Sequence, residues 1–277
     1  MSAPDAAAPD AAAPDVIAAA ESGLLEIRGL VKRFGGVTAV NALNMTVRAG
    51  DIHALIGPNG SGKTTTLNVI SALYRADGGS IRFDGAELIG RPSHAIAKLG
   101  IARTFQNIRL FGDLSVVENV MIGRHVRTRV GFVGALWPGG ATAREERATR
   151  ERALELLRFV GLDGTATVSA RSLPYGDQRR VEIARALAGE PRLLLLDEPA
   201  AGMNPAETDT LVALLRRIRE QGTTLLLIEH DMNLVMSVSD RITVLNFGQH
   251  IAEGPPDEVA RNRDVITAYL GGTLDAA

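Results

Sequence analysis

The sequence predicts an α/β fold in which a mostly parallel sheet is covered by helices on both faces. Three observations support this prediction. The last third of the chain alternates between near-continuous apolar runs and helical segments, the first third holds partly alternating runs of strand type, and the middle, from about Pro92 to Leu173, is mostly helical in pattern. We therefore expect one α/β core with an antiparallel β subdomain and an inserted helical subdomain, rather than two independent domains.

The composition is that of a globular protein, and it excludes several classes of function. The 277 residues are 45% hydrophobic and carry a formal net charge of −2, so there is no basic field of the kind that would indicate nucleic acid as a partner. The chain has no cysteine, which excludes disulfides, thiol nucleophiles and Cys-ligated metal sites. Its apolar runs are shorter than the roughly 18 to 20 residues that a membrane-spanning helix needs.

The two ends of the chain are predicted to be tails around a domain of residues 23–271. The first 22 residues repeat APD every five residues and lack the basic start and apolar core of a signal peptide. Repeated prolines and acidic residues offer too little apolar surface to bury, so we expect residues 1–22 to be disordered. Residues 272–277 are expected to be a short C-terminal tail.

The core elements follow from local patterns. Runs of strand type at 24–30, 42–47 and 51–57 are separated by turn residues, and a helix over 64–74 and a strand over 80–85 come next. In the last third, strands are expected over 192–197, 223–229 and 241–246, with helices over 206–221 and 232–239. Because these strands are almost wholly apolar, we expect them to be buried on both faces.

The inserted helical subdomain is expected over about residues 92–176. One helix is predicted around 115–125, and another, within 141–162, places Ala153, Leu156, Leu157 and Val160 on one face. The charged residues of the second helix are most simply a solvated face with intrahelical pairs. The glycine-rich stretch between them, which contains the only tryptophan, Trp137, is expected to be a surface loop or a short hairpin.

A phosphate-binding loop is predicted between a strand and a helix. GPNGSGKT (57–64) fits GxxxxGK[ST] in the context that this motif requires. Its glycines let backbone N–H groups point at phosphate oxygens, and the helix N-terminus adds a favourable dipole. Lys63 is expected to reach the β- and γ-phosphates and Thr64 to bind Mg²⁺. The residues assigned to the nucleotide are Gly57, Pro58, Asn59, Gly60, Ser61, Gly62, Lys63, Thr64 and Thr65.

Two adjacent acids at the end of an apolar strand complete this pattern. In LLLLDEP (193–199), Asp197 is expected to hold the metal and Glu198 to orient or deprotonate an attacking water. The alternative is a strand-end turn capped by Pro199, which is less favoured downstream of a phosphate loop. Hydrolysis of a nucleotide with Mg²⁺ is therefore the natural chemistry.

Further elements resemble a known family when they are taken in order. Gln106 follows the strand IARTF, LPYGDQRRVEIARAL (173–187) precedes the acidic strand, AAGMNP follows it, and His230 comes directly after the strand LLLIE. Together with the two motifs above, this order resembles the nucleotide-binding subunit of an ABC transporter from Leu24 to Gly271. The resemblance implies an ABC-type P-loop NTPase core that binds ATP and Mg²⁺.

The resemblance also implies roles for single residues. Phe34 corresponds to the aromatic residue that stacks on adenine, with a place in the core as the alternative. Gln106 corresponds to the glutamine that touches Mg²⁺ and the attacking water, and His230 to the switch histidine that contacts the γ-phosphate. Asn204 lies in the segment that contacts the opposite subunit, where the family usually has Asp.

The stretch LPYGDQ (173–178), here called the signature turn, departs from the family's usual LSGGQ. Pro174, Tyr175 and Asp177 replace Ser, Gly and Gln, whereas Gly176 is retained and is expected to face the partner's ATP. A helix is expected from Asp177 to Ala188, with Asp177 as its cap. This departure predicts two unequal ATP sites if the partner has an unmodified signature.

The resemblance finally implies an assembly. In this family two ATPase subunits pack head to tail, and ATP shifts them toward closure because it contacts both only when they are closed. The chain is most similar to the larger ATPase of branched-chain amino-acid importers. This implies a second ATPase subunit (a homodimer is the alternative), two transmembrane permeases and, indirectly, a periplasmic binding protein, at the cytoplasmic face of a bacterial inner membrane.

Two questions stay open from the sequence. Leu110, Phe111 and Leu114 lie near Gln106, where they either receive a short permease helix or pack within the helical subdomain. The cargo is the second question, since the ATPase never touches it. Urea, amide or other amino-acid import and lipopolysaccharide export are alternatives, and a soluble ABC ATPase outside transport is the alternative from a different class.

Overall fold

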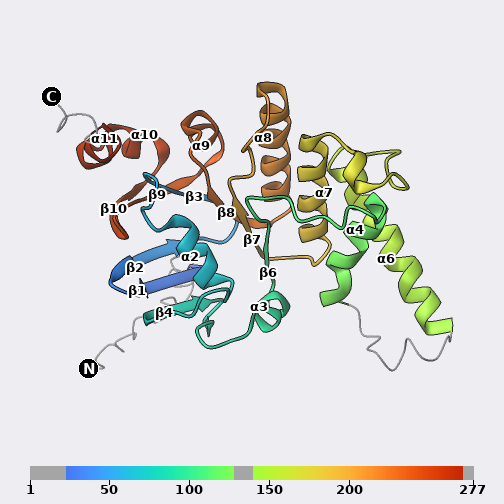
Figure 1. Cartoon of the computed structure of the whole chain (residues 1–277), viewed down its shortest axis with the longest axis horizontal. Helices are drawn as coiled ribbons and strands as arrows, with labels where there is room; N and C mark the ends of the chain where they lie inside the picture. Colours follow the sequence, from blue (N-terminus) through green and yellow to red (C-terminus); the bar gives the residue numbers. More distant parts are fainter. Residues whose placement is uncertain (1–22, 128–139, 271–277) are drawn as a thin grey trace, which may run out of the picture.

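The computed structural model describes residues 23–127 and 140–270, so the predicted tails and the stretch around Trp137 lie outside the described residues. Two sheets and a group of helices make up this part of the chain (Figure 1). Within it, none of the helices combines the length and hydrophobicity that crossing a bilayer requires.

The larger sheet has six strands in the order β10-β9-β3-β8-β7-β6. Its central strands β3, β8 and β7 are parallel and buried along their whole length, and only β10 runs antiparallel to its neighbour. The bounds are β3 Ile52–Ile56, β6 Ile101–Arg103, β7 Leu193–Asp197, β8 Thr224–Ile228, β9 Arg241–Asn246 and β10 Gln249–Gly254. The predicted parallel core is therefore confirmed.

The smaller sheet is antiparallel, in the order β2-β1-β4-β5. Its strands are β1 Leu25–Phe34, β2 Val37–Val47, β4 Gly78–Phe83 and β5 Ala86–Glu87. The first hairpin is longer than predicted, because Phe34 pairs with Val37 across a two-residue Gly-Gly turn. The sequence pattern missed these residues because that end of the hairpin is largely exposed and does not alternate.

Helices α4, α6 and α7 pack against one another to one side of the larger sheet (Figure 1). They span Val116–Gly123, Gly140–Phe159 and Tyr175–Leu187. The predicted apolar face of α6 is confirmed, because Ala153, Leu156 and Leu157 are buried in the same hydrophobic cluster as Val120 of α4 and Val181 of α7. Helix α4 begins at a capping box between Ser115 and Glu118, which satisfies two backbone donors that the helix leaves unpaired.

The remaining helices are α2 Lys63–Ile70, α3 Ser93–Leu99, α8 Pro205–Glu220, α9 Met232–Val238, α10 Pro256–Arg261 and α11 Arg263–Leu270, with short 3₁₀ turns η1 Arg124–Val126 and η2 Ala170–Ser172. Helix α2 is shorter than the predicted 64–74. The chain leaves the helix at Ala72, which adopts a left-handed conformation with φ 54°, so that Leu73 and Tyr74 both bond back to the Asn68 carbonyl.

Candidate nucleotide site

The phosphate loop, residues 57–64, lies between β3 and α2, as predicted. Two of its glycines are required by close contacts. A Cβ at Gly57, whose φ is 148°, would collide with the Leu245 carbonyl oxygen of β9, and a Cβ at Gly62, whose φ is 101°, would collide with the Ala39 carbonyl oxygen of β2. The loop is thus held between both sheets by backbone contacts that no larger residue permits.

Lys63 is folded inside this loop. Its ammonium donates to the carbonyl oxygens of Gly57 at 2.7 Å and Pro58 at 2.9 Å. Burial lowers the pKa of Lys63, and the nearby carboxylates of Glu198 and Asp197 oppose that shift. The positive charge therefore lies within the loop and within the field of the two acids. Of the threonines that follow, Thr64 is exposed and Thr65 half-buried.

Asp197 ends β7 and is almost completely buried. Its Oδ2 accepts a hydrogen bond from the Arg103 guanidinium at 2.8 Å, whereas its Oδ1 is buried without a hydrogen-bond partner. Burial raises the pKa of this carboxyl, and Arg103 only partly offsets the effect. An unpartnered carboxylate oxygen close to Lys63 fits a Mg²⁺ ion, which typically takes one or two carboxylates together with phosphate oxygens and waters.

The side chains around Asp197 suit a Mg²⁺ ion that takes most of its ligands from a nucleotide and water. Within residues 23–127 and 140–270, no group of three or more His, Cys, Asp or Glu side chains is arranged to hold a metal ion. A magnesium ion here would be held by Asp197 and the Thr64 hydroxyl, with Gln106 as a further candidate, and otherwise by the nucleotide itself.

Three predicted catalytic side chains meet at the carboxyl ends of β6, β7 and β8. The Gln106 amide donates to Glu198 Oε2 at 2.8 Å, and His230 Nδ1 lies 3.9 Å from the same oxygen. Glu198 has a left-handed backbone with φ 47°, a conformation that is uncommon for a residue with a Cβ. The three side chains come from segments far apart in sequence, so the fold itself brings them together.

Phe34 lies at the end of β1 with 44% of its surface exposed, which contradicts the alternative of a core position. The Tyr74 ring meets it edge-on at 5.2 Å between centroids, and the Lys32 ammonium lies 5.0 Å from its centroid. The exposed part of this ring offers an apolar surface on which a base can stack.

The start of α7 differs from the prediction. The helix begins at Tyr175 rather than Asp177, and its N-cap is Pro174, which forms no side-chain cap. The expectation that Asp177 caps the helix is therefore wrong. Asp177 lies inside the first turn, where its Oδ1 accepts from Arg180 at 2.5 Å. The retained Gly176 is buried against Glu207 of α8.

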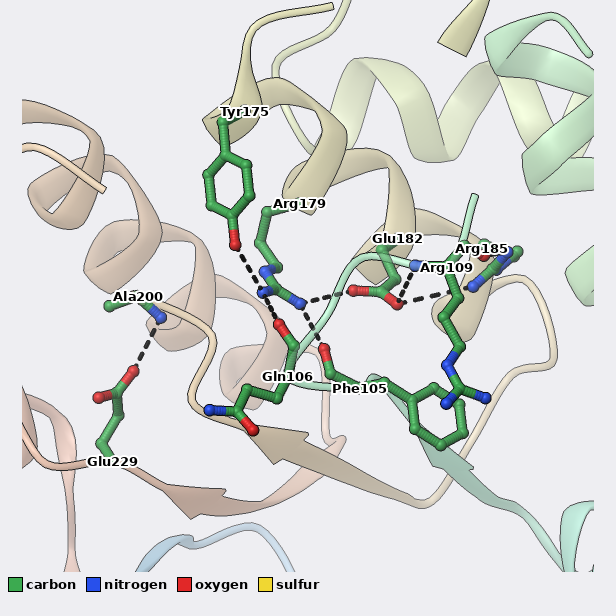
Figure 2. Close-up of polar contacts among 9 residues, drawn as sticks. All are labelled: Phe105, Gln106, Arg109, Tyr175, Arg179, Glu182, Arg185, Ala200 and Glu229. Atoms are coloured by element: carbon green, nitrogen blue, oxygen red, sulfur yellow. Dashed lines mark hydrogen bonds and ion pairs between the residues drawn. The ribbon is translucent and has the colours of Figure 1, made fainter. Parts of the chain in front are cut away.

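Sequence reasoning missed several polar residues that organise the site. Arg179 of α7 is fully buried, and Figure 2 shows its guanidinium between Glu182, Tyr175 and the backbone of Phe105 and Gln106. Glu229, buried at the end of β8, accepts from the Ala200 N–H at 2.8 Å and from the His230 N–H at 3.1 Å. Burial raises the pKa of Glu229. Only the position of Glu229 directly before His230 was available in the sequence as a signal.

The segment after β7 is held by local contacts. Asn204 caps α8, because its side chain accepts from the Glu207 N–H while Glu207 accepts from the Asn204 N–H, both at 3.0 Å. Asn204 therefore has a local structural role in the described chain. Together, the side chains of Asn204 and Glu207 satisfy two backbone donors at the start of the helix that follows the acidic strand.

A cavity of about 400 Å³ is lined by residues of α3, β6, α4, η1 and α7 and of the loops next to them. Of the three residues predicted for a permease contact, only Phe111 lines it, with 53% of its surface exposed. Leu110 packs against the hydrophobic cluster, as the alternative holds, and Leu114 is half-buried outside the cavity lining. Other lining residues include Ile96, Ile101, Phe105, Ile122 and Val126.

Comparison with known proteins agrees with this geometry. Residues 40–201 match the family described as ABC transporter, and residues 249–275 match the family described as branched-chain amino acid ATP-binding cassette transporter. The chain therefore belongs to the ABC transporter family of ATP-binding proteins. The predicted family and the predicted ABC-type fold are confirmed.

Its relatives are similar over nearly their whole length. The high-affinity branched-chain amino acid transport ATP-binding protein BraF of Pseudomonas aeruginosa is 49% identical over 90% of this chain and 98% of the relative. The corresponding LivG protein of Escherichia coli K12 is 45% identical over the same shares. Among solved structures, the ADP conformation of an ATP-binding cassette of an ABC transporter has a TM-score of 0.78 and 31% identity, covering 90% of this chain and 98% of that one.

Proposed function

We propose that this chain binds and hydrolyses MgATP to drive a branched-chain amino-acid importer. The convergence of Gln106, Glu198 and His230 beside a phosphate loop is the observation that carries the hydrolytic part of the proposal. The cargo rests on the relatives BraF and LivG, which are named for high-affinity branched-chain amino-acid transport.

In the proposed site, ATP lies with its adenine against Phe34 and its phosphates in the loop 57–64. Lys63 exchanges its bonds to the Gly57 and Pro58 carbonyls for bonds to the β- and γ-phosphates. The N–H groups of residues 59–65 bind phosphate oxygens at the positive end of α2. Mg²⁺, when bound, neutralises charge on the β- and γ-phosphate oxygens.

Glu198 is the proposed base. It accepts a proton from the water whose oxygen bonds to the γ-phosphorus, while the bond to the β,γ-bridging oxygen breaks and ADP leaves. Gln106, whose amide lies 2.8 Å from Glu198 Oε2, holds that water beside the carboxylate, and His230 donates to the γ-phosphate.

The proposed working unit is a head-to-tail pair of ATPase subunits, with a second, smaller ATPase as partner. Each ATP is then bound by the phosphate loop of one subunit and by the signature turn of the other, where Gly176 faces the partner's nucleotide. Since ATP bridges the subunits only when they are closed, binding favours closure and hydrolysis releases it.

Two permeases are the proposed membrane partners, at the cytoplasmic face of a bacterial inner membrane. The cavity beside Phe111 supports this part of the proposal, because its lining is mostly apolar and includes Phe105, the residue before Gln106. A short permease helix seated there would move with the α4–α7 helices when the ATPase pair closes. A periplasmic binding protein delivers the cargo on the other side.

The test is ATP turnover in the complete transporter, reconstituted with its permeases and binding protein, with and without leucine, isoleucine or valine. We expect these amino acids to stimulate hydrolysis. Stimulation by urea, an amide or another amino acid instead would replace the proposed cargo and leave the ATPase assignment intact.

Glu198→Gln tests the chemistry separately. We expect turnover to fall about 1000-fold, within the usual contribution of a general base, while ATP binding is retained. Glu220→Gln, at the exposed end of α8, is the matched control and should hydrolyse ATP normally. Unchanged hydrolysis by Glu198→Gln in the assembled transporter would refute the base assignment.

A further inference from the structure

Arg179 joins the helix of the signature turn to the loop that carries Gln106. Its Nη1 donates to the Phe105 carbonyl at 2.6 Å and to Glu182 at 2.7 Å, and its Nη2 donates to the Gln106 carbonyl at 2.6 Å (Figure 2). The side chain is fully buried. One guanidinium thus holds two consecutive carbonyls of a loop that begins on the larger sheet.

This arrangement fixes more than the fold of α7. Burying a charge is costly unless it is paired and hydrogen-bonded, and Glu182 on the same helix already supplies the pairing. The two carbonyl bonds fix the peptide planes on both sides of the Gln106 Cα. They therefore set the direction in which the Gln106 side chain leaves the loop toward Glu198.

The next residue of the helix, Arg180, has the same chemistry directed elsewhere. Its guanidinium also donates to two consecutive carbonyls, of Val160 and Gly161, both at 3.0 Å, and it pairs with a carboxylate three residues away, Asp177. Those acceptors directly follow α6, so Arg180 links α7 to the end of α6 and not to the loop of Gln106. The two neighbours therefore make the same kinds of contact with different acceptors, and Arg180 is the more exposed of the two, with 20% of its side chain accessible.

Tyr175 connects Arg179 to the phosphate-facing end of α7. It is the first residue of the helix, next to Gly176, and its hydroxyl lies 3.3 Å from Arg179 Nη2. Its ring packs against Gly202, in the segment after the acidic strand. Tyr175 therefore contacts both Arg179 and the segment that follows Glu198.

We propose that Arg179 is a positioning residue that transmits closure of the signature turn over the partner's ATP to Gln106 and Glu198 in this chain's own ATP site, with Tyr175 orienting its guanidinium. The inference rests on the proposed roles of Gln106 and Glu198. Through these contacts within a single subunit, the chain's own ATP site would respond to whether the partner's ATP is bound.

The test compares Arg179→Lys with Arg180→Lys in the assembled transporter. A lysine retains the charge beside Glu182, but its single ammonium cannot bond both loop carbonyls and Glu182 in the geometry of the guanidinium fork. We expect kcat of ATP hydrolysis to fall about tenfold in Arg179→Lys, because a small misplacement of a catalytic group is costly. The KM for ATP should change less than twofold, since Phe34 and the phosphate loop are untouched, and Arg180→Lys should keep kcat within about twofold of wild type.

A double-mutant cycle with Gln106→Ala separates positioning from stability. If Arg179 acts through Gln106, adding Arg179→Lys to Gln106→Ala should lower kcat by less than about twofold. The same tenfold loss in both backgrounds, or equal losses in Arg179→Lys and Arg180→Lys, would overturn the proposal. If Arg179→Lys does not fold, the same test can be made with Tyr175→Phe, since this substitution removes only the hydroxyl that contacts Arg179.

Tyr175→Phe should lower kcat about threefold in wild type and leave it unchanged in the Gln106→Ala background. Equal effects of Tyr175→Phe in both backgrounds would count against the proposal. If Gln106→Ala itself hydrolyses ATP normally, the proposed role of Gln106 fails first, and the inference fails with it. If Gln106→Ala is impaired but neither Arg179→Lys nor Tyr175→Phe is, only the inference fails.

Discussion

Two helix N-termini of this chain are proposed to bind phosphate groups, and they are built differently. Helix α2 begins at Gly62, in a left-handed conformation with φ 101°, and Lys63 closes the loop before it by bonding to Gly57 and Pro58. Helix α7 begins after Pro174, without a side-chain cap, and Gly176 in its first turn is packed against Glu207 of α8. The first terminus thus has a lysine bond within its own loop as well as backbone contacts to β2 and β9, whereas the second packs through Gly176 against a side chain of α8.

This difference suggests that the α2 terminus forms a complete site within one subunit, whereas the α7 terminus completes a site only when two subunits are closed. The glycines, the lysine and the nearby acids of the α2 terminus all come from one subunit, so we expect it to bind phosphate before any partner is present. The α7 terminus lies among helices α4, α6 and α7, and in the proposed function it meets the partner's nucleotide only on closure. Changes at α2 should therefore alter affinity or stability in the single subunit, whereas changes at α7 should alter only the closed pair.

Lys63→Ala is expected to give the largest effect on affinity. Removing an ammonium that bonds two phosphates should weaken ATP binding by about 3 kcal/mol, roughly 100-fold, from the usual strength of charge-assisted hydrogen bonds. Isothermal titration of the isolated subunit measures it. An unaltered affinity would count against the phosphate-loop assignment and against the idea that this terminus is complete without a partner.

Acid should weaken the strand that supports α2. His53 of β3 is fully buried, and its Nε2 lies 2.8 Å from Thr243 Oγ1. Burial lowers the pKa of His53 from 6.5 to about 4, with Glu253 opposing and Arg241, Arg48 and His250 adding to the shift. The unfolded chain then binds a proton that the folded chain does not, so stability is full above pH 6.5 and falls as the pH drops toward 4.

The loss attributable to His53 should reach about 3 kcal/mol near pH 4, since each unit of pKa shift corresponds to about 1.4 kcal/mol. Denaturant unfolding at pH 7 and at pH 4 to 5 measures it, with His53→Gln as the comparison because glutamine can retain the bond to Thr243 but does not titrate. If both proteins lose the same stability in acid, the buried neutral histidine is not the cause.

The sequence predicted the α2 terminus well and the α7 terminus only in part, for a physical reason. The phosphate loop and the pair Asp197–Glu198 are short motifs in their own strand contexts, so each could be recognised locally. The start of α7 could not, because Tyr175 and Arg179 are placed by contacts with Gly202 and with carbonyls 73 and 74 residues away. Asp177 was assigned as a cap because a local pattern cannot show that the helix begins two residues earlier.

Pro174→Ser should have the smallest effect, and it tests the comparison of the two helix termini most directly. Pro174 has φ −53° and ψ 155°, a backbone that serine adopts readily at an N-cap. Serine restores a hydroxyl and an N–H at the signature turn, so it can both cap α7 and contact the partner's γ-phosphate. We expect turnover at the partner's phosphate loop to rise about threefold, and ATP affinity of the isolated subunit to stay the same.

The informative measurement is hydrolysis at each of the two sites of the ATPase pair, with the catalytic base of the other site disabled. A rise confined to the site formed by the partner's phosphate loop would show that the altered signature makes the two sites unequal. A change in the isolated subunit's affinity would contradict the view that the α7 terminus acts only on closure. If hydrolysis is unchanged at both sites, the replacement of serine by Pro174 has no functional effect. An asymmetry between the sites would then have to come from Tyr175 or Asp177.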